Sequence, residues 1–418
     1  MQVFCTSTWI LFDKAPAIYD FFEPLCEQYH LLAFVLFPSL TKGSYMKKLA
    51  MILLAGTLVS GSFAEKPKFE PFGFVKGDMY YTVGGVKSWG QPSLTCASIA
   101  TGVDSNAVGF TAQHTRFGLK GSGKSGDITM GGLIELDFFV IAANANAKPR
   151  MRLAYAWCDP LEGLEIRAGQ QWDLFSPLNP TTNNTNANLW YDGNYGFRRP
   201  QLTLQYSVDL GTIKPIIQVS AGETTKEDDL FFDTTGQGSI GSWIGADNKS
   251  GIPLTQGRLA ASFLTNMEIG VAAVYGVYGV DRDYKTMGFS VDANLPIDKL
   301  FALKAEFATG TNLNNANLFT IGGNGSATKD VETNGFWVEA TSKPHSNFNA
   351  VLGFGDEMVS STVTTGAESN MTGYADLIFP IGEFFSLAVE YQLLSTKLVN
   401  VDDPNIAHVI DIAGKVVF

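Results

Sequence analysis

The stretch FFSLAVEYQLL, Phe384 to Leu394, alternates apolar and polar side chains along its length. In an extended chain, one side carries Phe385, Leu387, Val389, Tyr391 and Leu393. The other side carries Ser386, Ala388, Glu390 and Gln392. A period of two residues predicts a β-strand with one apolar face and one polar face.

The same alternation recurs along the chain, for example in VIDIAGKVVF (409–418) and FALKAEFA (301–308). It predicts sixteen strands, near residues 72–83, 110–120, 128–141, 149–158, 164–172, 200–209, 212–221, 257–265, 267–278, 284–295, 300–309, 332–343, 346–355, 370–380, 384–394 and 405–418. The connections alternate between tight turns such as DPLEG and long links such as 222–256. A two-sheet sandwich does not predict that order, whereas a membrane-spanning barrel does.

We therefore predict an all-β fold, a closed antiparallel transmembrane β-barrel of about 16 strands with short periplasmic turns and long extracellular loops. The ring has to close because an open strand edge in hydrocarbon would leave unpaired N–H and C=O groups, each costing several kcal/mol.

The segment MKKLAMILLAGTLVSGSFA, Met46 to Ala64, has a basic start, an apolar core and a small-x-small end. These features predict a secretory signal peptide, whose removal would leave 418 − 64 = 354 residues, 65–418, for the barrel. A signal sequence that starts at residue 46 suggests that the upstream start codon is wrongly chosen, so we expect residues 1–45 to be a translated leader. A genuine N-terminal extension is the alternative.

The composition argues against several kinds of partner. With 29 Lys+Arg against 41 Asp+Glu, the net charge is −12, and no basic surplus exists for nucleic acid. No apolar run reaches the roughly 18 residues of a spanning helix. Two of the four cysteines, Cys96 and Cys158, lie in the predicted mature chain and permit at most one disulfide. No metal-ligand spacing is present, and we expect neither a metal nor a cofactor.

The run FGLKGSGKSGD, Phe117 to Asp127, matches a phosphate-binding loop through Gly118, Gly123, Lys124 and Ser125. Phosphate binding at such a loop requires a helix after it. Here the residues on both sides alternate with period two, so we predict that Gly118 to Ser125 closes a β-hairpin and that no nucleotide binds.

The apolar faces are expected to contact lipid, where a charge costs about 2–4 kcal/mol at mid-depth. The predicted outward sets include Met151, Leu153, Tyr155 and Trp157; Leu202, Leu204, Tyr206 and Val208; and Met287, Phe289, Val291 and Leu295. Aromatics near strand ends are expected in the interfacial girdles: Tyr80, Tyr81, Trp157, Trp172, Phe384 and Phe418. The inward faces carry charges of both signs, which predicts an aqueous lumen.

Four arginines, Arg116, Arg150, Arg152 and Arg167, come from the second, fourth and fifth predicted strands and are expected to line one stretch of wall. Together with Lys120, they would bias permeation toward anions. The alternative is that Glu135 and Asp137, on the intervening strand, neutralise them as a salt-bridged ladder. The sequence leaves both readings open.

The third long link, Asp173 to Pro200, is rich in Asn, Thr, Gly and Pro. We predict that residues 173–199 fold into the lumen as a constriction; lying over the mouth is the alternative. Its charged residues complete the set of pore-lining candidates: Asp173, Asp192, Arg198 and Arg199.

Five segments, TRFGLKG, GLIELDFF, RMRLAYAW, LEIRAGQQWDLFSPLNP and RRPQLTLQY, resemble the corresponding run of dicarboxylate-type (DcaP-like) outer-membrane porins, over about residues 110–210. The resemblance implies a 16-stranded, trimeric porin with its third loop in the pore, passing small hydrophilic or carboxylated solutes. It also places the selectivity residues of the family on Arg116, Arg152 and Arg167. Phe418 resembles the terminal aromatic that the barrel-assembly machinery recognises.

The function expected from the sequence is passive diffusion of small hydrophilic solutes, including anionic or carboxylated ones, through a porin. The chain would be exported through the periplasm to the outer membrane of a Gram-negative bacterium and would contact its lipid. Two alternatives are an outer-membrane barrel enzyme and a surface-adhesion or structural barrel, the latter using the links 222–256 and 310–331. We predict no enzymatic activity because His114, His345 and His408 form no grouping with a serine and an acid.

Overall fold

The computed structural model describes residues 2–5, 8–11, 67–86, 106–139, 147–185, 189–223, 252–263, 267–278, 284–297, 301–316, 318, 320–321, 330–342, 348–359 and 367–418. The chain forms two compact units, Met1–Val59 and Ser60–Phe418. In the first unit, β1 (Gln2–Cys5) pairs antiparallel with β2 (Thr8–Leu11). The predicted signal peptide, 46–64, lies outside the described residues. That residues 1–45 are a leader stays a prediction.

The described part of the second unit consists mostly of strands. They are β3 (Lys68–Val83), β4 (Ala107–Thr111), β5 (Arg116–Ser125), β6 (Ile128–Asp137), β7 (Arg150–Leu161), β8 (Leu164–Trp172), β9 (Arg198–Ser207), β10 (Ile213–Gly222), β11 (Leu254–Phe263), β12 (Met267–Tyr278), β13 (Tyr284–Leu295), β14 (Phe301–Thr311), β15 (Glu332–Ser342), β16 (Asn349–Val359), β17 (Ala367–Ile381), β18 (Phe385–Leu398) and β19 (Asn405–Val417). One 3-10 helix, η6 (Leu313–Ala316), follows β14. Within the described residues, no helix is long and apolar enough to cross a membrane.

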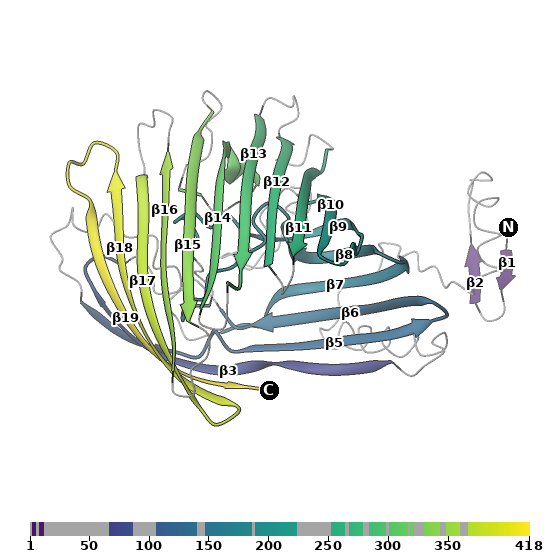
Figure 1. Cartoon of the computed structure of the whole chain (residues 1–418), viewed down its shortest axis with the longest axis horizontal. Helices are drawn as coiled ribbons and strands as arrows, with labels where there is room; N and C mark the ends of the chain where they lie inside the picture. The colour runs from purple at the N-terminus through teal and green to yellow at the C-terminus, as the bar shows by residue number, and fades with distance from the viewer. Residues whose placement is uncertain are drawn as a thin grey trace. The chain divides into compact units, whose positions relative to one another are not determined.

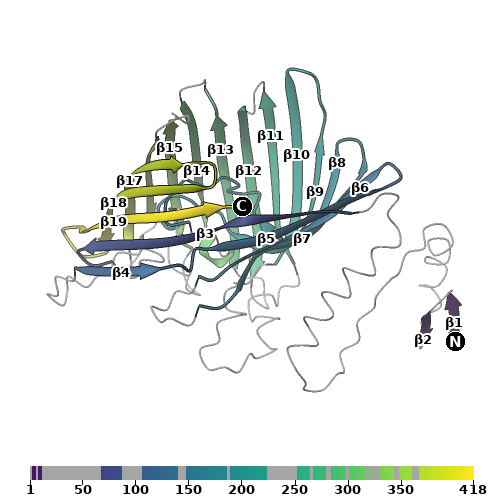
Figure 2. The same cartoon turned by 90° about the horizontal axis from the view of Figure 1, so that it is seen from below.

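Neighbouring strands pair antiparallel around a closed ring, as Figures 1 and 2 show. The ring closes where β19 pairs with β3, and Gly73 and Phe418 exchange backbone hydrogen bonds at its edge. Because β4 and β5 pair with successive stretches of β3, they form one interrupted crossing, and the described strands make a 16-strand barrel. The predicted fold class and strand number are confirmed.

The second crossing differs from its prediction over 110–120. It breaks between Thr111 and Arg116, where Thr115 donates a backbone hydrogen bond to Ala112. The hairpin predicted at Gly118 to Ser125 exists, but those residues belong to β5, and the turn is Gly126 and Asp127. Gly126 has φ +59°, a left-handed conformation that glycine adopts without strain. Strand β6 follows directly, so the helix that a phosphate-binding loop requires is not there.

The outward face is apolar, as the alternation predicts. On β9, Leu202, Leu204 and Tyr206 are exposed, whereas the intervening Thr203 is buried. The same order continues on β10, where Ile217 and Val219 are exposed and Ser220 is buried. Water-soluble proteins rarely expose an apolar surface that recurs on strand after strand, so this band is suited to contact with lipid.

Two residues of the predicted outward set, Tyr155 and Trp157, face inward. The pairing of β6 with β7 shifts by one residue between Glu135 and Leu136. A one-residue shift exchanges the two faces of a strand beyond that point. Trp157 consequently pairs with Arg167 and Tyr155 with Gly169, and directly paired residues share a face. The prediction was wrong for this pair because the bulge interrupts the period of two.

The assignment of residues to the two faces of the barrel wall can be tested at two adjacent isoleucines on β10. We expect Ile217→Lys to destabilise the barrel by about 2–4 kcal/mol, because Ile217 faces lipid. Ile216, which pairs with Ala260 on the inner face, is the matched control, and its replacement by lysine should cost much less. Urea unfolding in lipid vesicles measures both. Equal losses would contradict the assignment of the two faces.

Candidate functional site

The link between β8 and β9, residues 173–197, is called the inner loop; residues 186–188 of it are not described. Its first part packs on inward-facing side chains, with Phe175 in a buried cluster that includes Val274 and Leu313. Ser290, on β13, donates its hydroxyl to the carbonyl oxygen of Phe175. The first part of the inner loop therefore packs against the inward-facing side of the wall.

The local sequence explains why the inner loop is not a strand. Pro177 and Pro180 have no backbone N–H to donate to a sheet. The remaining N–H groups need acceptors inside the ring, because buried backbone groups are costly when unpaired. Carboxylates and the Gln256 amide oxygen on the inner wall supply several of these acceptors.

Glu306, on β14, accepts three hydrogen bonds: from the Ser176 hydroxyl at 2.6 Å, from the Leu178 N–H at 2.8 Å and from the Trp337 indole at 2.8 Å. Glu339, on β15, accepts from the backbone N–H and the hydroxyl of Thr181. Hydrogen bonds to a carboxylate are stronger than neutral ones. These two groups hold the first half of the inner loop.

The loop tip is bound in the same way to the last two strands. The N–H of Asn183 donates to Glu390 at 2.7 Å, and its side-chain amide donates to Asp411 at 2.9 Å. Both carboxylates are buried. From β14 to β19, the inner loop thus covers the acidic part of the wall and uses its carboxylates as hydrogen-bond acceptors.

The base of the inner loop contains a buried ion pair. Arg199 makes a two-pronged contact with Asp173, at 2.6 and 2.7 Å. The same guanidinium donates to the carbonyl oxygens of Ala316 and Glu223. Gln256 also donates to Asp173, at 2.8 Å. Arg199 and Asp173, both predicted pore-lining residues, therefore connect the inner loop to the segment after β14.

Asp192 is fully buried within the inner loop and accepts a hydrogen bond from Asn370 at 2.6 Å. Burial raises the pKa of its carboxyl well above the usual range, and the neighbouring Glu357 adds to that rise. Arg198, at the end of the loop, is buried and lies over the ring of Trp172 at 5.2 Å. Trp172, expected at a membrane interface, thus contacts the first residue of β9.

Three of the four predicted arginines are paired with carboxylates, and two of these, Arg150 and Arg152, pair with the predicted partners Glu135 and Asp137. Arg150 contacts Asp137 at 2.7 and 2.9 Å, and Arg152 contacts Glu135 at 2.6 Å and Asp137 at 3.0 Å. For Arg150 and Arg152, this arrangement favours the neutralised ladder over the open positive patch.

The other cationic candidates, Arg167, Lys120 and Arg116, differ from one another in their partners. Arg167 pairs with Glu165 at 2.5 Å and lies 5.1 Å from the ring centre of Tyr155. Lys120 is exposed and lies 5.5 Å from Trp157. The guanidinium of Arg116 donates to the carbonyl oxygen of Thr185 at 2.6 Å, and in the described part of the chain no carboxylate forms an ion pair with it. Whether any of these residues sets selectivity stays a prediction.

Alternation along the predicted strands puts Glu306, Glu339 and Glu390 on the polar, inward side, but it predicts no role for them. Alternation shows which side a residue faces, but it carries no signal for a partner more than a hundred positions away. The prolines of the inner loop were a partial signal for such partners. A segment that cannot form a β-ladder needs other hydrogen-bond acceptors for its backbone N–H groups. In the described residues, no group of three or more His, Cys, Asp or Glu side chains has an arrangement that could hold a metal ion.

No known protein family matches the sequence, and no curated protein is significantly similar to it. Solved structures do match the fold. The outer membrane channel DcaP of Acinetobacter baumannii matches with a TM-score of 0.66 and 18% identity, over 84% of this chain and 97% of that one. The anion-selective porin from Comamonas acidovorans matches with a TM-score of 0.56 and 11% identity, over 84% and 100%.

A third structure, Salmonella typhi OmpF in complex with daunomycin, matches with a TM-score of 0.55 and 13% identity, over 83% of this chain and 97% of that one. At these identities the comparisons establish the architecture. The chain has the fold of outer-membrane porins, as its resemblance to DcaP-like sequences implies.

Proposed function

We propose that this protein is an outer-membrane porin, a water-filled channel through which small hydrophilic solutes diffuse passively. A closed ring of sixteen strands is wide enough for an aqueous channel. The apolar outward band fits a bilayer, and the charged inner wall fits a wet lumen. The inner loop, held inside the ring, would form the constriction. We propose no enzymatic activity.

The covered acidic wall is the observation that carries the proposed preference for anionic or carboxylated solutes. Glu306, Glu339 and Glu390 each accept hydrogen bonds from the inner loop. The inner loop thus covers these carboxylates, whereas Arg116 and Lys120, on β5, have no carboxylate partner in the part described. Unbalanced positive charge at a constriction favours anions.

We further propose a homotrimer in the outer membrane of a Gram-negative bacterium. One matching structure is a trimer form of OmpT, an outer membrane protein of Vibrio cholerae. Phe418, half-exposed with its ring 5.7 Å from that of Phe117, is the residue that we propose the barrel-assembly machinery recognises during insertion.

Planar-bilayer recording of the refolded chain 65–418 tests the channel. We expect stepwise, ohmic conductance and, in a salt gradient, a reversal potential of the sign that indicates anion preference. Heat-denatured protein in the same detergent is the control. A chain that is folded by circular dichroism but gives no conductance would refute the porin function, whereas conductance with cation preference would refute only the selectivity.

A further inference from the structure

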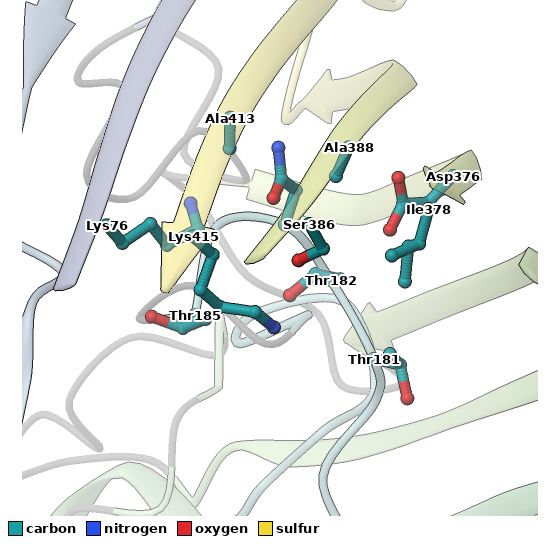
Figure 3. A pocket seen from close by; sticks show the side chains of 11 residues that line it. Lys76, Thr181, Thr182, Thr185, Asp376, Ile378, Ser386, Ala388, Ala413 and Lys415 are labelled. Carbon is teal, nitrogen blue, oxygen red and sulfur yellow. The ribbon is translucent and has the colours of Figure 1, made fainter. Parts of the chain in front are cut away.

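A small pocket lies between the tip of the inner loop and the wall formed by β17, β18, β19 and β3 (Figure 3). Lys76 and Lys415 enter it from β3 and β19, and Asp376 enters from the opposite side in this view. The hydroxyls of Thr182 and Ser386 lie between them. The pocket thus has a cationic side, an anionic side and polar groups between the two.

The anionic side carries more negative charge than its partners compensate. Asp376, Glu390 and Asp411 are directly paired across three neighbouring strands and all are buried. Like charges in that position repel. Asn183 donates to Glu390 and Asp411, but Oδ1 of the Asp376 side chain, 2% exposed, has no hydrogen-bond partner among the described residues.

The cationic side of the pocket carries more positive charge than its carboxylate partners compensate. Lys415 pairs directly with Lys76 across β19 and β3, which places two ammonium stems side by side. Lys76 forms an ion pair with Asp78. Lys415 lies 5.8 Å from the ring centre of Phe74, and no described carboxylate comes within ion-pair distance of it.

A carboxylate and an ammonium therefore line one pocket without meeting, although each would be stabilised by an opposite charge. An anion alone would be attracted to Lys415 and repelled by Asp376. A cation alone would be attracted to Asp376 and repelled by Lys415. A molecule that carries both charges satisfies both sides at once.

We propose that this pocket binds a small zwitterion, with its ammonium group on Asp376 and its carboxylate on Lys415. The hydroxyls of Thr185 and Ser386 can form hydrogen bonds with the rest of the molecule. The inference rests on the proposed function in that it names a solute class for the same lumen, and it adds to the anionic solutes a class that carries no net charge.

Calorimetric titration of the folded barrel in detergent with glycine and β-alanine tests the site without relying on conductance. Acetate and methylammonium, each with one of the two charges, are the comparison ligands. We expect glycine or β-alanine to bind more tightly than both. Asp376→Asn and Lys415→Gln should each weaken zwitterion binding at least about tenfold, because each removes a charged hydrogen-bonding partner.

The two variants should also have different effects on the two ligands that carry a single charge. Lys415→Gln should abolish acetate binding, and Asp376→Asn should abolish methylammonium binding. Lys397→Gln, which breaks an exposed ion pair with Glu368, is the control and should bind like the parent chain. Zwitterion binding no tighter than that of acetate or methylammonium, or unchanged in both pocket variants, would overturn the proposal. Binding by a barrel that conducts no current would refute the porin function and leave the pocket assignment standing.

Discussion

Arg199→Met is expected to destabilise the barrel by about 3–5 kcal/mol, the loss typical of a buried ion pair that keeps one unpartnered charge. Asp173 is fully buried, and the two prongs of Arg199 at 2.6 and 2.7 Å satisfy both of its carboxylate oxygens. The same arginine binds the Ala316 carbonyl oxygen, so the segment after β14 should loosen as well. Urea unfolding in lipid vesicles, followed by tryptophan fluorescence, measures the loss.

Three further variants make that result specific to the pair. Arg167→Met is the control, because its partner Glu165 is partly exposed and exposed ion pairs contribute about 0–1 kcal/mol. Arg199→Lys should recover part of the stability but lose the two-pronged contact. If Arg199→Met fails to fold, the double change Arg199→Met with Asp173→Leu removes both charges and should fold. Unfolding midpoints of Arg199→Met equal to the parent would contradict a structural role for the pair.

Arg116→Gln is expected to lower the anion-to-cation permeability ratio at least about twofold, because it removes a positive charge that no described carboxylate balances. Arg116→Glu should lower the ratio further. The effect should be larger at low ionic strength, where charges are less screened. Reversal potentials across a bilayer, in a salt gradient, give the ratio directly.

A paired arginine provides the matched control. Arg150 and Asp137 contact each other at 2.7 and 2.9 Å, so the double change Arg150→Gln with Asp137→Asn removes no net charge. We expect the reversal potential of that variant to stay at the parent value. If the double variant shifts the potential and Arg116→Gln does not, the selectivity resides in the salt-bridged ladder and not in Arg116.

The barrel could be predicted from the alternation along each strand. Whether a side chain contacts lipid or water depends only on which face of its own strand it occupies. Every second residue of FFSLAVEYQLL faces lipid, and the same requirement applies to each crossing independently. Strand bounds consequently agree closely, as in β8 and β13, which match their predicted ranges of 164–172 and 284–295. The tight turns predicted which strands are adjacent in the barrel, because a tight turn joins neighbouring strands.

The pattern failed where one residue is inserted. Between Glu135 and Leu136 the register shifts, and Tyr155 and Trp157 turn from the lipid to the lumen. Gln170, 3% exposed, donates to the carbonyl oxygens of Met151 and Arg152 at this irregularity. No single-strand pattern reports a bulge, because a bulge is a property of two strands paired together.

Alternation between residues two apart was enough to predict the strand number of the ring, most of its two faces and the charges that face inward. Which of those charges lack a partner inside the ring depends on contacts between segments far apart in the chain. Glu390 and Asn183 are separated by 207 positions, and their contact depends on how the inner loop crosses the closed barrel. Whether a buried charge is balanced is settled by such distant partners, and alternation along a strand contains no information about them.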